Sequence, residues 1–142
     1  MTAKEYLLDL RKLRRKTDNR VKQCKNIREN LMFLQGIDYG KDKIQTSAKD
    51  QLAETMSKLL DLEAETVELI HEYEERYNEG VKRINSLSRK EYVDILTMRY
   101  LEDDYEKRKF EHIACEINYS YVRTCHLHGE ALQEFERKYL QQ

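Results

Sequence analysis

The chain has 142 residues and a net charge of −1; 37% of its residues are charged, 39% are hydrophobic, and none is Pro or Trp. That length fits one domain or two small ones, and the composition favours long helices with narrow apolar seams over a large core. No apolar run approaches the roughly 20 residues that span a bilayer, the N-terminus has no signal-peptide pattern, and the three Cys follow no framework spacing, so we expect a cytoplasmic protein that does not contact a membrane.

Two long helices are expected in the first 87 residues. Apolar residues recur at steps of three and four from residue 3 to 34 and again from 48 to 85, which is the period of an amphipathic helix. Between them, Gly36 and Gly40 indicate a turn, and Thr46 or Ser47 is the expected cap of the second helix. Because residues 1–35 carry a net +6 and residues 36–87 a net −5, we expect the helices to pair as an antiparallel, coiled-coil-like hairpin.

Three shorter helices are expected in the last third of the chain. Ser88 and Glu91 have the spacing of a capping box, and a helix over 89–101 should follow. An acidic turn leads to a helix over 107–117, and Asn118 suits the left-handed conformation of a tight turn. Ser120 is then the expected cap of a final helix over 121–139. The fold class predicted is therefore all-α, with a helical hairpin over 1–87 and a three-helix domain over 88–142.

The last two helices have the pattern of a helix-turn-helix. Its second helix enters the major groove of DNA by its N-terminal end. Burial of Thr124, Leu127, Ala131, Leu132 and Phe135 would leave one face at the start of that helix open to DNA bases and phosphates. The predicted DNA-binding residues on this face are Ser120, Tyr121, Val122, Arg123, Cys125 and His126.

Several short motifs carry a family resemblance. Met98-Arg99-Tyr100-Leu101, Ile113-Ala114, Tyr119-Ser120 and Ala131-Leu132 resemble the fold of sigma-70 region four. With the hairpin in front, the chain resembles small regulators of Gram-positive phages and prophages of the RinA and ArpU type. The resemblance implies a transcriptional regulator that binds double-stranded promoter DNA in the bacterial host cytoplasm and contacts RNA polymerase.

Charge sets a condition on this hypothesis. Residues 88–142 carry a net −2, whereas neutralised phosphates supply most non-specific DNA affinity. We therefore expect additional binding energy from a homo-oligomer, from polymerase, or from a basic strip on the first helix that contacts DNA or a partner. That strip consists of Arg11, Lys12, Arg14, Arg15 and Lys16.

Two other functions remain open at this stage. A DNA-packaging component similar to a small terminase subunit would also join a DNA-binding helical domain to an oligomerising segment. A helical adaptor that binds protein and no DNA would fit the acidic C-terminal third. We expect neither an enzyme nor a cofactor, because no nucleophile–base pair or phosphate-binding loop is recognisable. No metal is expected either, because His112, Cys115, Cys125 and His128 lie on helices without a knuckle loop.

Overall fold

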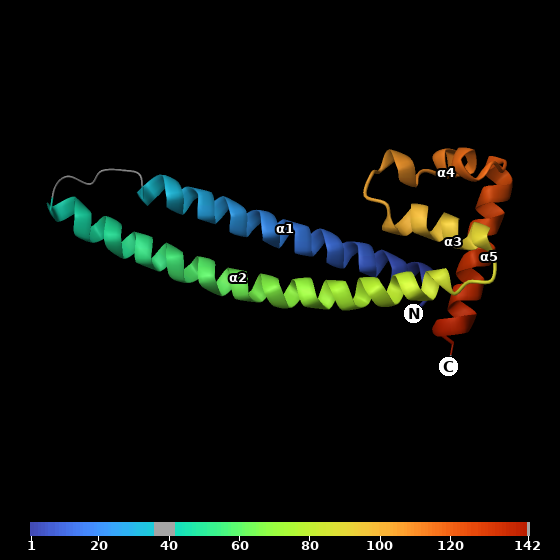
Figure 1. Cartoon of the computed structure of the whole chain (residues 1–142), viewed down its shortest axis with the longest axis horizontal. Coiled ribbons are helices and arrows are strands. Elements are labelled where there is room, and N and C mark those ends of the chain that lie inside the picture. The colour runs from blue at the N-terminus through green and yellow to red at the C-terminus, as the bar shows by residue number, and fades with distance from the viewer. Residues whose placement is uncertain (36–41, 142) are drawn as a thin grey trace. The chain divides into compact units, whose positions relative to one another are not determined.

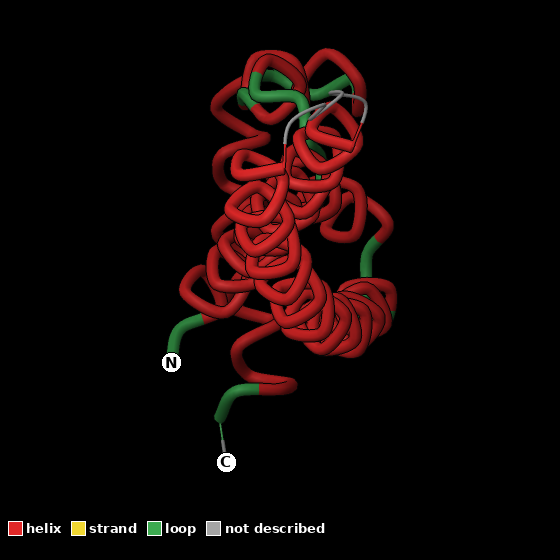
Figure 2. The backbone as a smooth tube through the Cα atoms, turned by 90° about the vertical axis from the view of Figure 1, so that its left-hand side faces the viewer, coloured by secondary structure: helices red, strands yellow, loops and turns green. Residues whose placement is uncertain are grey.

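A computed structural model describes residues 1–35 and 42–141, with backbone alone at 34–35 and 42–48. Within these residues all regular structure is helical, which confirms the predicted all-α class (Figures 1 and 2). The α-helices are α1 (Ala3–Gln35), α2 (Asp42–Asn85), α3 (Lys90–Leu96), α4 (Phe110–Ile117) and α5 (Tyr121–Tyr139). A π-helical turn, Thr97–Leu101, continues α3, and a 3-10 turn, Glu106–Arg108, precedes α4.

The chain forms two compact units. One, which we call the terminal unit, contains Met1–Leu13 and Glu74–Gln142. The other, the middle unit, contains Arg14–Tyr73. The terminal unit thus includes the first residues of α1 and the last part of α2 as well as all the shorter helices. The expected division into a helical hairpin over 1–87 and a three-helix domain over 88–142 stays a prediction.

In the middle unit, α1 and α2 run antiparallel. The Cys24 Sγ and Thr66 Oγ1 atoms lie 3.4 Å apart, and Arg28 pairs with Glu63, so the partner number falls as the position on α1 rises. Leu31 and Leu59 are buried in the seam between the helices. Thr66 is buried as well, and its hydroxyl donates to the Leu62 carbonyl at 2.6 Å, which satisfies it within its own helix.

In the terminal unit, a core forms from both ends of the chain. It is centred on eight buried residues that come from the start of α1, the end of α2 and the C-terminal helices: Ala3, Leu7, Ile84, Leu87, Leu96, Tyr100, Ala131 and Phe135. Gly80 leaves room for the Leu10 side chain here, since a Cβ atom at that position would lie 2.9 Å from the Leu10 Cδ2 atom. The helices α3 and α5 and the π-helical turn therefore pack on residues far away in sequence.

Two expected helix starts are wrong. The α2 helix begins at Asp42, so Thr46 and Ser47 lie inside it and do not mark its N-terminus; Gly36 and Gly40 lie outside the described residues. The α3 helix has Arg89 as its first flanking residue and no side-chain cap. The expected capping box is absent because the Ser88 N–H donates to the Glu134 carboxylate of α5, 3.1 Å away, and not to the Glu91 side chain.

The helix expected over 89–101 changes geometry at its end. From Thr97 the chain widens into the π-helical turn, whose last carbonyls lack partners within the helix. The Arg11 guanidinium donates to the carbonyls of Arg99 and Tyr100 and lies over the Tyr100 ring, 5.6 Å from its centre. Arg11 therefore caps this turn from α1, a role that the local sequence does not show.

Candidate nucleic-acid interface

The turn between α4 and α5 depends on Asn118. This residue has φ 61° and ψ 39°, in the left-handed region, and no other non-glycine residue of the described chain has a positive φ. Its neighbour Tyr119 donates its N–H to the Ala114 carbonyl at 3.1 Å, which ends α4 in the manner of a left-handed cap. The predicted conformation at Asn118 is thus present, and it turns the chain sharply into α5.

Ser120 starts α5 as predicted. Its hydroxyl oxygen accepts the Arg123 N–H at 3.1 Å, and its carbonyl accepts both the N–H and the hydroxyl of Thr124. These bonds hold the first turn of α5 in place, and they leave the Ser120 side chain at the solvent-exposed end of the helix. A capped helix N-terminus carries a partial positive charge that favours a phosphate oxygen.

The two faces of α5 divide largely as expected. Thr124, Leu127, Ala131 and Phe135 are buried, whereas Leu132 is half-buried. On the other face, Tyr121 is 50% and Val122 64% exposed, and Arg123 and His126 are also exposed. Cys125 is only half-buried and lies at the margin of this face. The structure therefore brings five of the six predicted residues together on an open surface, with Cys125 at its edge.

Aromatic packing holds this surface from behind. The Phe110 ring of α4 meets the Tyr121 ring edge-on at 6.5 Å between centres and the His128 ring at 5.0 Å. The Arg99 guanidinium lies 4.4 Å from the Phe110 centre. Beneath them Ile95, Ile113 and Leu127 form a second small core. Tyr121 is thus positioned by a ring contact as well as by its helix, which limits its freedom before any ligand binds.

His128 belongs to this interior. Its Nε2 atom lies 2.9 Å from the Tyr100 hydroxyl. Burial, followed by the nearby charges of Arg99 and Lys4, lowers the pKa of His128 from 6.5 to about 4. The ring is therefore neutral at neutral pH and serves packing. The described residues contain no group of three or more His, Cys, Asp or Glu side chains placed to hold a metal ion.

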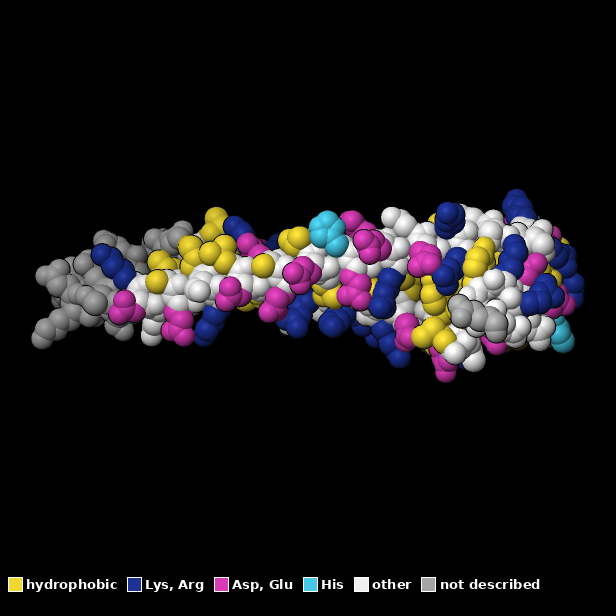
Figure 3. Space-filling view, turned by 90° about the horizontal axis from the view of Figure 1, so that it is seen from below, with side chains coloured by type: hydrophobic (Ala, Val, Ile, Leu, Met, Phe, Trp, Pro, Cys, Tyr) yellow, Lys and Arg dark blue, Asp and Glu magenta, His cyan; other side chains and the backbone are white. Residues whose placement is uncertain are grey.

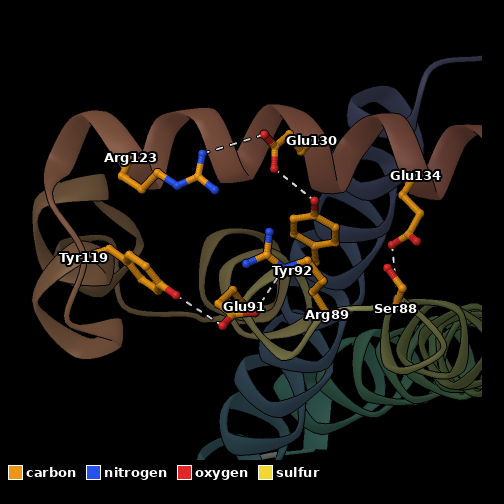
Figure 4. A network of polar contacts seen from close by, with 8 residues as sticks. All are labelled: Ser88, Arg89, Glu91, Tyr92, Tyr119, Arg123, Glu130 and Glu134. Atoms are coloured by element: carbon orange, nitrogen blue, oxygen red, sulfur yellow. Dashed lines mark hydrogen bonds and ion pairs between the residues drawn. The ribbon is translucent and has the colours of Figure 1, made fainter.

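Acidic side chains lie beside Arg123 and Tyr119, on the side of α5 that faces α3 (Figure 4). The Arg123 Nη1 atom lies 3.8 Å from Glu130 Oε1, and the other oxygen of Glu130 accepts the Tyr92 hydroxyl at 2.9 Å. The Tyr119 hydroxyl donates to Glu91 at 3.2 Å, and Arg89 lies beside the same carboxylate. The predicted set of site residues did not include these neighbours. Glu130 could have been found, since it follows Arg123 by seven residues, or two helical turns.

The pKa values of the acidic groups follow from these contacts. Its own backbone N–H, and then Tyr119 and Arg89, lower the pKa of Glu91. The Ser88 hydroxyl and N–H lower the pKa of Glu134. Both carboxylates are thus ionised at neutral pH, and both add negative potential on this side of the terminal unit.

The predicted basic strip is not one uniform surface. Arg11 is engaged with the π-helical turn, and Lys12, 80% exposed at its side chain, lies 4.0 Å from Asp9. Arg14 is half-buried, whereas Arg15 and Lys16 are exposed. Arg11 and Lys12 belong to the terminal unit, whereas Arg14, Arg15 and Lys16 belong to the middle unit. Arg11 thus has an internal role, and Lys12, Arg15 and Lys16 are the exposed cations of the set.

Comparisons with protein-family models, with curated proteins and with solved structures find no match to this chain. Within the described residues, no helix is both long and apolar enough to cross a lipid bilayer.

Proposed function

We propose that this protein is a DNA-binding transcriptional regulator of the phage or prophage type, which places the start of α5 in the major groove. The observation that carries the proposal is the arrangement at residues 118–126. A left-handed turn at Asn118 leads into a Ser120-capped helix whose first exposed face holds Tyr121, Val122, Arg123 and His126. The α4 helix and its aromatic contacts support this face from behind.

Each exposed side chain has a role in this proposal. The Ser120 cap and the helix N-terminus bind a phosphate oxygen. Arg123 reaches a guanine edge or a second phosphate, and Tyr121 and His126 donate to base edges or the backbone. Val122 is apolar and contacts a thymine methyl group. The Arg123–Glu130 pair costs little to open, because its atoms are 3.8 Å apart and its side chains are 47% and 43% exposed.

The acidic surroundings predict modest affinity. With few cations at the site, few counterions are released on binding, so the salt dependence should be shallow. RNA polymerase is therefore the second partner in this proposal, since contacts to a protein already on the promoter would compensate for a weak DNA interface. Binding of one partner would then raise the local concentration of the other.

Fluorescence anisotropy with duplexes selected from a random DNA pool, measured over a salt series, tests the proposal. Replacing Arg123 and His126 together by Ala should weaken binding by about tenfold or more, because one good base contact is worth about 1–3 kcal/mol. The matched control replaces Arg137 and His71, both exposed and outside the site, by Ala. Equal losses in the two double variants would contradict the proposal.

A protein-binding adaptor is the second candidate. The 64% exposure of Val122 favours it, as do the carboxylates of Glu91 and Glu130, which contact Tyr119 and Arg123. It predicts that no duplex is selected from the pool at low salt. The Arg123 and His126 double variant would then fold normally, and neither it nor the original chain would bind nucleic acid.

A further inference from the structure

The middle unit has an apolar face that its two helices do not cover. Among the described side chains of this unit, six large apolar ones are between 39% and 71% exposed. One is Phe33, and the other five are Val21, Met32, Met56, Leu60 and Val67. Hydrophobic side chains are open to solvent along the long helices in Figure 3. Scattered exposed apolar residues need no explanation, so what matters is whether these five share one face.

Helical periodicity places them in two stripes. Val21 and Met32 are eleven residues apart, as are Met56 and Val67, and eleven residues make three turns of an α-helix. Leu60 follows Met56 by one turn. Each stripe also contains a charged residue seven positions after its first member and four before its last: Arg28 on α1 and Glu63 on α2.

An ion pair shows that both stripes open on the same side. Arg28 Nη2 and Glu63 Oε1 meet across the seam between α1 and α2. Since each of these residues lies in its stripe, the stripes flank the seam on one face of the helix pair. By the same periodicity, the other face presents exposed polar residues: Gln23, Asn30, Lys58 and Glu65. Lys25, four positions after Val21, also lies in the α1 stripe and is exposed. One side of the helix pair therefore holds the five apolar residues together with Lys25, Arg28 and Glu63, and the other side is polar.

The register of the pair places the two stripes level with one another. Cys24 is level with Thr66 and Arg28 with Glu63. Met32, one turn beyond Arg28, is then level with a point between Met56 and Leu60. Val21 is level with a point just past Val67. Val21 and Met32 thus each have an apolar residue of α2 within about one helical turn of their own height.

We propose that this face binds a second copy of the chain, so that two middle units form a four-helix bundle. A twofold axis parallel to the helices places α1 of one copy against α2 of the other at equal height. Met32 then packs between Met56 and Leu60 of the second copy, and Val21 packs beside Val67 of the second copy. Arg28 meets Glu63 of the second copy, which extends the ion pair into an alternating set of four charges.

Charge selects this arrangement over its alternative. A twofold axis perpendicular to the helices would place α1 on α1, and residues 1–35 carry a net +6. The parallel axis instead places them against residues 36–87, which carry a net −5. Like charges across an interface oppose association, and opposite charges set the orientation of helical partners. The proposal does not depend on DNA binding, although a dimer would present two copies of α5 to DNA.

Sedimentation equilibrium of the full chain over a wide concentration series tests association. The expected result is a species of twice the 17.2 kDa chain mass. Leu60→Glu should raise the dimer Kd by about a hundredfold or more, because it buries an unpaired charge in the interface. Asn30→Glu adds the same charge on the polar face and should change the Kd by about threefold or less. Leu60 is 60% exposed in the single chain, so circular dichroism should show both variants fully helical.

Cross-linking tests the orientation. In a chain whose three native Cys are replaced by Ala, a mixture of Met32→Cys and Leu60→Cys copies should form a disulfide between copies, and each variant alone should not. A chain that is monomeric at every concentration, or a dimer that Leu60→Glu does not weaken, would overturn the proposal. Disulfides between two Met32→Cys copies would overturn the orientation and show α1 on α1. Binding of this face to another protein by a monomeric chain would also overturn it.

Discussion

The two compact units use the same kind of helix and bury it to different extents. In the terminal unit, α3 and α5 cover the ends of α1 and α2, and Leu7, Ile84 and Phe135 are fully buried. Among the described residues of the middle unit, the same two helices pack only against each other. Leu31 and Leu59 are buried there, whereas Leu60, next in sequence to Leu59, is 60% exposed. A pair of helices covers one seam, so a wider apolar stripe needs a further layer.

Large-to-small substitutions should give the largest difference between the two units in the free energy of unfolding that is lost. Phe135→Ala empties the centre of the terminal core and should lower the free energy of unfolding by about 3–5 kcal/mol. Leu59→Ala should cost about 2 kcal/mol, because a seam beside solvent relaxes more easily than a closed core. Urea unfolding followed by circular dichroism measures both. Equal losses would show that the two units are equally well packed and would break the comparison.

Acid should destabilise the terminal unit through His128. Its pKa is about 4 when folded and about 6.5 when unfolded, so the unfolded chain takes up a proton that the folded chain excludes. The contribution of His128 to stability is complete above pH 6.5 and is lost as the pH falls toward 4. Allowing for the partial access of solvent to the ring, the loss is about 2 kcal/mol.

Urea unfolding at a series of pH values checks this expectation. His128→Gln should flatten the dependence between pH 6.5 and 5, where few carboxylates titrate. His126→Gln removes an exposed ring on the same helix and should leave the dependence as it is. If both variants kept the slope, another group would be responsible.

Removal of one cation should show how α1 supports the π-helical turn. Arg11→Ala takes away the donor to the Arg99 and Tyr100 carbonyls and should cost about 1.5 kcal/mol, the low end for hydrogen bonds from a charged group. Lys12→Ala removes the same charge from an exposed neighbour and should change stability by less than about 0.5 kcal/mol. Thermal unfolding of the two variants measures the difference, and similar melting temperatures would remove the tertiary role of Arg11.

Much of the candidate interface follows from local sequence. The left-handed residue, the cap and the buried face of α5 involve bonds between positions a few residues apart, so Asn118, Ser120 and Thr124 could be assigned from the chain alone. The neighbours of the interface could not. Glu91 reaches Tyr119 across 28 positions, and Arg11 reaches the π-helical turn across 88 and 89 positions. Such pairs leave no periodic pattern in the sequence.

By itself, the sequence determined the all-α class, the extents of α1 and α5, and the turn between α4 and α5, because helix periodicity and capping act within one or two turns. Only the tertiary structure decided that Ala3 and Leu7 complete the core under α3 and α5, and that Glu134 takes the Ser88 N–H from the expected capping box. It also decided which apolar residues of the long helices remain exposed to solvent. Burial depends on what packs against a stripe, and the local sequence does not specify that partner.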